Sequence, residues 1–204
     1  MSLKPRGKDA FEMWCKQGEP VVYLCGNWSM YLYRFALWVG YGLMTLPADT
    51  LAIHSSCIVY RDKAVLFLGE SGTGKSTHSS LWLKNIAGTW LLNDDNPVIR
   101  VVGEDVLVYG TPWSGKTPCY KNQSLPLNGV VRLSQAPHND IKRLPMLQAY
   151  ASLMPACSCM RWDRKSTDAL HKTVEKVITK VGCWHLECLP DNDAAIVCSS
   201  AITK

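Results

Sequence analysis

One run of residues in the first half of the chain has the composition and spacing of a phosphate-binding loop. Four apolar residues typical of a buried strand precede it, and its sequence is Gly69-Glu70-Ser71-Gly72-Thr73-Gly74-Lys75-Ser76-Thr77. In such Gly-x-x-x-x-Gly-Lys-Ser loops, glycines let the backbone curl so that successive N–H groups point at phosphate oxygens. The N-terminus of the following helix adds a partial positive charge at the same place. The pattern therefore predicts a nucleotide-binding site.

The polar positions of this loop have distinct expected roles. We expect Lys75 to reach the β- and γ-phosphates and the hydroxyl of Ser76 to bind Mg²⁺. The expected cofactors are therefore ATP and Mg²⁺, although the loop pattern does not separate ATP from GTP. The rest of the expected nucleotide-binding set is Gly69, Ser71, Gly72, Thr73, Gly74 and Thr77.

Two adjacent carboxylates, Asp94 and Asp95, follow the next strand pattern after the loop. An acidic residue at the end of such a strand commonly holds the Mg²⁺ that bridges the phosphates. The second carboxylate can then accept the proton of an attacking hydroxyl. The sequence Asp-Asp-Asn-Pro is also typical of a plain turn. The complete loop upstream favours the catalytic interpretation.

Further candidates lie on either side of these motifs. His54 stands fifteen residues before Gly69 in a strand pattern, where it can contact a phosphate, carry a proton or serve only a structural role. The segment 111–118 predicts a second glycine-containing loop, which can cover the nucleotide or receive the acceptor. Lys116 and Arg132 are candidates for stabilising a transferring phosphoryl group, with ordinary surface cations as the alternative.

Composition restricts the class of protein. The chain has 204 residues, of which 47% are hydrophobic, as expected of one globular domain with a proper core. We expect a polar N-terminal segment over 1–20 and a single nucleotide-binding domain over 21–204. The net charge of +5 is mild and no long basic run occurs, so nucleic acid is not an expected partner.

The cysteines and one aromatic segment bear on location. The nine cysteines are scattered and no secretory leader pattern precedes them, so we expect reduced, mostly buried thiols in a cytoplasmic protein. The segment 28–46 is rich in aromatic residues but contains Arg34 and two glycines. We expect a helix packed on the core, not a membrane span, with a partner-binding face as the alternative.

Hydrophobic periodicity predicts an α/β protein in which hairpins alternate with helices. That mixture favours a mixed β-sheet over a purely parallel one. We expect strands at 21–24, 51–60, 64–68, 89–93, 98–102, 106–109, 128–134 and 184–188. We expect helices at 9–17, 29–42, 77–84, 146–153, 166–181 and 194–202.

The motifs together resemble a known family. The residues His54-Ser55-Ser56, the phosphate loop and Leu91-Leu92-Asn93-Asp94-Asp95 are similar to the catalytic domain of HPr serine kinase/phosphorylase, in the phosphoenolpyruvate carboxykinase-like superfamily. The stretches 109–115 and 184–187 look like those of short bacterial HPr-kinase-related proteins. The resemblance implies the mixed-sheet P-loop kinase core of that type. It also implies an ATP-dependent kinase in which Ser76 and Asp95 hold Mg²⁺ and Asp94 is the general base, with His54 nearby.

The chain departs from the family in ways that leave the acceptor open. Thr77 stands where the family has an acidic residue, and the family's Gly-Arg-Asn signature is not found. The acceptor hydroxyl can therefore belong to a serine of a protein or peptide or to a small molecule. Relatives form oligomers, so a homo-oligomer is possible. Two other functions remain open: a non-catalytic ATP-binding regulatory module and a phosphoenolpyruvate carboxykinase-type lyase, whose additional metal and dicarboxylate sites the sequence does not display.

Overall fold

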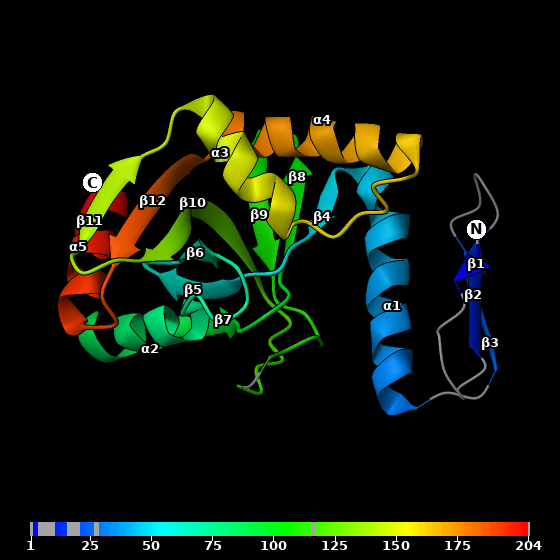
Figure 1. Ribbon diagram of the computed structural model, residues 1–204, viewed down its shortest axis with the longest axis horizontal. Helices are drawn as coiled ribbons and strands as arrows, with labels where there is room; N and C mark the ends of the chain where they lie inside the picture. The colour runs from blue at the N-terminus through cyan, green and yellow to red at the C-terminus, as the bar shows by residue number, and fades with distance from the viewer. Residues whose placement is uncertain (1, 4–10, 16–20, 27–28, 116, 204) are drawn as a thin grey trace.

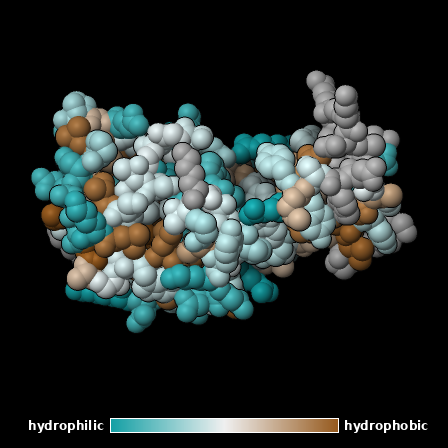
Figure 2. Space-filling view, turned by 90° about the horizontal axis from the view of Figure 1, so that it is seen from below, coloured by the Kyte–Doolittle hydropathy of each residue, from teal (hydrophilic) through white to brown (hydrophobic). Residues whose placement is uncertain are grey.

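The computed structural model describes residues 2–3, 11–15, 21–26, 29–115 and 117–203. They form a larger α/β body and a smaller N-terminal portion, connected by a long helix (Figure 1). In the described part of the chain, no helix is both long and apolar enough to cross a membrane. Figure 2 shows the same two portions from below, joined by a narrower part of the molecule.

The main body is built on a mixed sheet, which confirms the expected fold class. Its strands run in the order β7-β5-β6-β10-β12-β11. Strands β6, β10 and β12 are parallel, whereas β5 and β11 are antiparallel to their neighbours. The bounds are Ser56–Tyr60 (β5), Lys63–Leu68 (β6), Trp90–Asn93 (β7), Ser124–Gln135 (β10), Asp140–Arg143 (β11) and Gly182–Cys188 (β12).

A second, antiparallel group of strands continues from the long strand β10. The first residues of β10, Ser124–Pro126, pair with β9. From Leu127 onward β10 pairs with β6, with a register shift between Leu127 and Gly129. One strand thus belongs to both groups, so the sheet curls. The remaining strands of this group are β4 (Thr50–Ala52), β8 (Val98–Val102) and β9 (Asp105–Tyr109).

Helices cover both faces of the sheet because successive strand residues point to opposite sides. Ile58, Val65 and Phe67 pack with the buried Trp82 under α2 (Lys75–Asn85) and α5 (Asn192–Ile202). Val59 and Leu66 face the other layer, which contains α3 (Met146–Leu153) and α4 (Arg164–Lys180), as Figure 1 shows.

Burial raises the pKa of the Cys157 thiol to about 12, as expected of an inert core cysteine.

The N-terminal portion contains three antiparallel strands and the helix α1 (Met30–Thr45). The strands are β1 (Ser2–Leu3), β2 (Phe11–Cys15) and β3 (Val22–Gly26). One side of α1 packs through Ala36 against Met13 of β2, and its other side places Trp38 against the main body. The helix expected from the aromatic segment is confirmed. The boundary expected at residue 20 stays a prediction.

Two sequence-based predictions were wrong at the level of single elements. The helix expected at 9–17 is replaced, where it is described, by β2, because every residue of 11–15 pairs with β3 and the pairing buries Met13. The strand expected at 51–60 is divided at 53–55 into β4 and β5, because the chain passes there from one group of strands to the other. There the amides of His54 and Ser55 donate to the carbonyls of Ala156 and Asp95 at 2.8 and 2.9 Å.

The approach of two backbone segments at Gly110 gives the first testable prediction. A Cβ atom at Gly110 would lie 2.1 Å from the backbone oxygen of Lys121, so Gly110→Ala requires a backbone shift. We expect this substitution to lower the free energy of unfolding by about 1–3 kcal/mol in urea denaturation. The control is Gly42→Ala in α1, where the nearest contact of the new methyl group is an ordinary 3.5 Å. Wild-type stability of Gly110→Ala would contradict the packing described here.

Candidate functional site

Three sequence motifs meet at one edge of the sheet. The phosphate loop follows β6 and the two aspartates follow β7, and both strands lie beside β5. Because β5 is antiparallel to both neighbours, its first residues lie where β6 and β7 end. Ser56 is opposite Phe67 of β6, and Cys57 is opposite Asn93 of β7. The motifs far apart in sequence therefore come together, as the candidate site requires.

The loop itself has the backbone that phosphate binding requires. Gly72 and Gly74 have φ angles of 85° and 108°, in the left-handed region that residues with a side chain rarely adopt. Helix α2 begins directly at Lys75, and no described side chain caps its N-terminus. The N–H groups of its first turn are therefore available to an anion, with the helix dipole in support. Ser76 and Thr77 are exposed on this turn.

Lys75 occupies the interior of the curved loop. Its Nζ donates to the carbonyl oxygens of Gly69 and Glu70 at 2.9 and 3.2 Å, and the residue is only 8% exposed. Burial lowers the pKa of the ammonium group, while Asp95 and then Asp94 act in the opposite direction. Both aspartates thus lie close enough to Lys75 to influence the pKa of its ammonium group.

A residue that sequence reasoning missed, Asn93, holds the aspartates in place. Its fully buried amide oxygen accepts from the backbone N–H groups of Asp95 and Asn96 at 2.9 and 2.8 Å. Its amide nitrogen donates to Thr111 Oγ1 at 3.1 Å and to the Trp113 carbonyl at 3.0 Å. An Asn that starts a turn was the available signal. One side chain thus couples the end of β7 to the loop 111–118.

The two carboxylates have different surroundings. Asp94 is 5% exposed, and its Oδ2 accepts from the backbone N–H of Thr117 at 3.1 Å. Asp95 Oδ1 lies 3.3 Å from His54 Nε2, and its Oδ2 accepts from Asn96 Nδ2 at 2.5 Å. The side chains of His54 and Asp95 are 45% and 34% exposed. The loop 111–118 therefore covers Asp94, whereas Asp95 and His54 are accessible from outside.

The donor atoms near the loop suit Mg²⁺. The described residues contain no group of three or more His, Cys, Asp and Glu side chains that could hold a metal ion. Mg²⁺ does not need such a cage, because it commonly takes one or two carboxylates together with phosphate and water oxygens. The hydroxyl of Ser76 and the carboxylates that act on its neighbour Lys75 are hard oxygen donors of this kind.

Two pockets flank the loop and the aspartates. The first, of about 550 Å³, lies beside the loop and α2 and has several apolar side chains in its wall. The second, of about 460 Å³, lies between Asp95 and α1. The first pocket is lined by Gly72, Thr73, Gly74, Thr77, His78, Leu81, Leu133, Gln135, Ala136, Cys188, Leu189 and Pro190.

Two other predicted residues are not placed at the site, and one residue that was not predicted contacts the phosphate loop. Lys116 lies outside the described residues, and Arg132 is exposed on β10 but lines neither pocket. Gln135 was not expected to take part, yet its Nε2 donates to the Gly72 carbonyl at 3.4 Å. It comes from the far end of β10, so only the sheet topology could have revealed it.

The sequence comparison agrees with the motifs. The HPr kinase/phosphorylase of Lachnoclostridium phytofermentans is 24% identical over 201 residues, which cover 95% of this chain. This chain is HPr-kinase-like. The match covers 59% of that relative, so the chain spans less than two thirds of its length. The resemblance expected from the motifs is thereby confirmed.

Two further comparisons add less. No model of a known protein family matches the chain. Among solved structures, the Hpr(Ser) kinase/phosphatase from Coxiella burnetii has a TM-score of 0.42 and 11% sequence identity, and the match covers 74% of this chain and 93% of that one.

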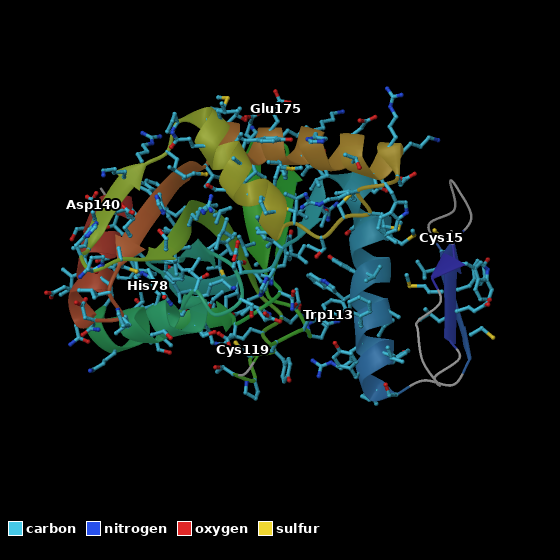
Figure 3. The ribbon with its side chains drawn as sticks, in the orientation of Figure 1. Cys15, His78, Trp113, Cys119, Asp140 and Glu175 are labelled. Carbon is cyan, nitrogen blue, oxygen red and sulfur yellow. The ribbon has the colours of Figure 1, made fainter. Side chains whose placement is uncertain are left out.

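His78, labelled on α2 in Figure 3, gives a pH-dependent prediction. It is buried against Phe67, its Nε2 accepts from Trp82 Nε1 at 3.2 Å, and burial lowers its pKa to about 4. Because the unfolded state has an ordinary histidine pKa of about 6.5, the unfolded state alone binds the proton between pH 6.5 and 4. The free energy of unfolding should therefore fall by about 3 kcal/mol as the pH is lowered from 6.5 to 4.

The measurement is urea denaturation at pH 7.5 and 4.5 without metal or nucleotide. His78→Gln keeps an acceptor for Trp82 but does not titrate, so this variant should lose less stability on acidification than the wild type. An equal loss in both proteins would show that His78 is not the cause.

Proposed function

We propose that this protein is an ATP-dependent phosphotransferase that moves the γ-phosphate to a hydroxyl group with the help of Mg²⁺. The observation that carries the proposal is the convergence of Lys75, the open N-terminus of α2 and two aspartates at one sheet edge. The similarity to an HPr kinase/phosphorylase supports the same activity. Phosphoryl transfer requires positioned cations and a carboxylate more than covalent chemistry by the protein, and these residues supply both.

The loop and the first pocket suit the two ends of a nucleotide. The backbone N–H groups of the loop and α2 are oriented for the phosphates, and the adjoining pocket has Leu81, Leu133 and Leu189 in its wall for an apolar base. Lys75 now donates to two loop carbonyls, and a phosphate oxygen is a stronger acceptor for the same ammonium group. Binding would thus turn Lys75 from the loop toward the nucleotide.

The transfer step balances with the groups at hand. The acceptor oxygen forms a bond to the γ-phosphorus as the bond between that phosphorus and the β,γ-bridging oxygen breaks, and ADP leaves. The hydroxyl proton passes to an aspartate carboxylate. Mg²⁺, held by Ser76 and one aspartate, would neutralise charge on the phosphates. Lys75 stabilises the same charge from within the loop.

The two aspartates have two possible assignments. The resemblance implies Asp94 as the base and Asp95 as the metal ligand. The surroundings support the exchanged roles, because Asp95 lines the second pocket beside His54, whereas Asp94 lies under the loop 111–118. We therefore take Asp95 as the proton acceptor, with His54 Nε2 3.3 Å from its carboxylate, and Asp94 as the metal ligand. A homo-oligomer and a cytoplasmic location stay predictions, and the sequence left the identity of the acceptor open.

The decisive experiment is transfer of the γ-phosphate from labelled MgATP to free serine, an HPr protein and a mixture of serine-containing peptides. Asp95→Asn should lower the transfer rate by about 100-fold or more, because the base is lost, while MgATP affinity is retained. Asp94→Asn should instead raise the Mg²⁺ concentration needed for half-maximal rate. Asp62→Asn in the exposed β5–β6 turn is the matched control.

The possible outcomes distinguish the two assignments of the aspartates, and a kinase from a non-catalytic module. The opposite pattern in the two variants would restore the assignment that the resemblance implies. Tight MgATP binding without transfer to any acceptor would contradict the kinase proposal and favour a non-catalytic ATP-binding module.

A further inference from the structure

The second pocket combines residues from the N-terminal helix with residues of the catalytic edge. It is lined by Met30, Tyr31, Arg34, Phe35, Trp38, Asp95, Asn96, Trp113 and Ser114. The α1 residues Tyr31, Arg34, Phe35 and Trp38 follow the spacing of one helix face. The wall of the pocket therefore contains both the proposed base and a helix that the phosphate-binding machinery does not use.

Asn93, which holds the backbone of Asp95, also holds a wall of this pocket through Trp113. Trp113 lies between its loop and α1, as Figure 3 shows, with ring centroids 5.0 Å from Trp38 and 5.7 Å from Tyr41. Its indole N–H donates to the Arg34 carbonyl at 3.1 Å, and its own carbonyl accepts from Asn93. The pocket is therefore held in a set position relative to Asp95.

The rim of the pocket exposes large apolar side chains. Tyr31 is 77% exposed, Met30 73% and Phe35 52%. Neighbouring apolar side chains at this exposure, around a hollow beside a catalytic carboxylate, are typical of a binding site. Aromatic rings give such a site a large contact area at low cost in side-chain entropy.

The opposite charges of Arg34 and Asp95 restrict how a ligand can be oriented in the pocket. Arg34 is exposed, and its guanidinium makes no ion pair with any described carboxylate. Guanidinium groups bind carboxylates through paired hydrogen bonds. Asp95, in the wall of the same pocket, repels an anion but accepts a hydroxyl proton. A ligand that suits both residues has a hydroxyl toward Asp95 and a carboxylate toward Arg34.

Size favours a peptide segment over a single amino acid. A volume of about 460 Å³ falls in the range of pockets that hold drug-sized ligands. Free serine has both a hydroxyl and a carboxylate but no apolar part for Tyr31 and Phe35 to contact. A serine or threonine flanked by an aromatic and an acidic side chain matches all three features of the pocket.

We propose that this pocket binds the phosphate acceptor, and that the acceptor is a peptide segment whose hydroxyl residue is flanked by an aromatic and an acidic residue. The aromatic side chain packs on Tyr31 and Phe35, and the acidic side chain pairs with Arg34. The proposal rests on the proposed kinase function for the role of the bound hydroxyl. Its binding claim can be tested without catalysis.

The test is affinity selection from a peptide library with a fixed central serine and randomised flanking positions. The full chain is immobilised with MgADP, and retained peptides are sequenced. We expect at least a fivefold enrichment of Asp or Glu at one flanking position and of Phe, Tyr or Trp at another. Arg34→Glu should replace the acidic preference with Lys or Arg, and Tyr31→Ala should remove the aromatic preference.

Matched controls keep the result specific. Arg164→Glu and Trp162→Ala alter an exposed arginine and an exposed tryptophan that do not line the pocket, so both should select like the wild type. An unselective library, or preferences that Arg34→Glu leaves unchanged, would overturn the proposal. So would concentration-dependent self-association of the wild type that Tyr31→Ala abolishes, because a second copy would then cover the pocket.

The pocket and the kinase function can fail separately. Selected peptides that accept no phosphate from MgATP would contradict the kinase function but keep the binding site. Phosphate transfer to a small hydroxyl compound, with no selection of peptides, would keep the kinase function and overturn the pocket's assignment.

Discussion

The buried side chain of Asn93 is the interaction on which the site depends most. Its oxygen accepts hydrogen bonds from the backbone directly after β7, where the two aspartates lie. Its nitrogen donates to the Thr111 hydroxyl and to the Trp113 carbonyl. A fully buried amide whose donors and acceptor are satisfied is expensive to disturb, because each unpaired group would cost about 1–3 kcal/mol. The aspartates and the loop that covers Asp94 therefore form a single unit, and through Trp113 that unit extends to α1.

The position of β5 explains why this unit lies beside the phosphate loop. An antiparallel strand between β6 and β7 places its own beginning at the edge where the other two end. His54, Lys75 and Asp95 therefore lie close together although up to 41 residues separate them in the sequence. The proposed chemistry then follows from a short list of groups: cationic and N–H groups for phosphates, carboxylates for a metal and a proton, and a pocket on each side.

The sequence predicted the local parts of this arrangement well. The strand, loop and helix around Lys75 were predictable because glycine conformations and an apolar run are local signals. Helix α3 was predicted at its observed bounds, and the mixed sheet is confirmed. Strand β2 was missed because its pairing with β3 outweighs a weak local preference. Strand β11 was missed because it pairs with a strand more than 40 residues further along the chain, with Arg143 opposite Trp184 and Asp140 opposite Glu187.

The pockets were not predictable for a related reason. Their walls combine residues that are far apart in the sequence, such as Gly72 with Leu189 and Arg34 with Trp113. No local pattern records such a meeting, since it depends on how strands are ordered and on how α1 packs. Asn93 and Gln135 illustrate the same point within the site: each is an ordinary polar residue in the sequence, and its function is visible only from its partners.

The central claim is that this loop binds the phosphates of a nucleotide, and calorimetric titration with MgATP tests it most directly. Lys75→Met keeps the buried stem and removes the charge, while Lys84→Met makes the same change at an exposed position of α2. The account predicts saturable binding by the wild type and by Lys84→Met, and at least a tenfold weaker affinity in Lys75→Met. Equal affinity in all three proteins, or no binding by the wild type, would contradict it.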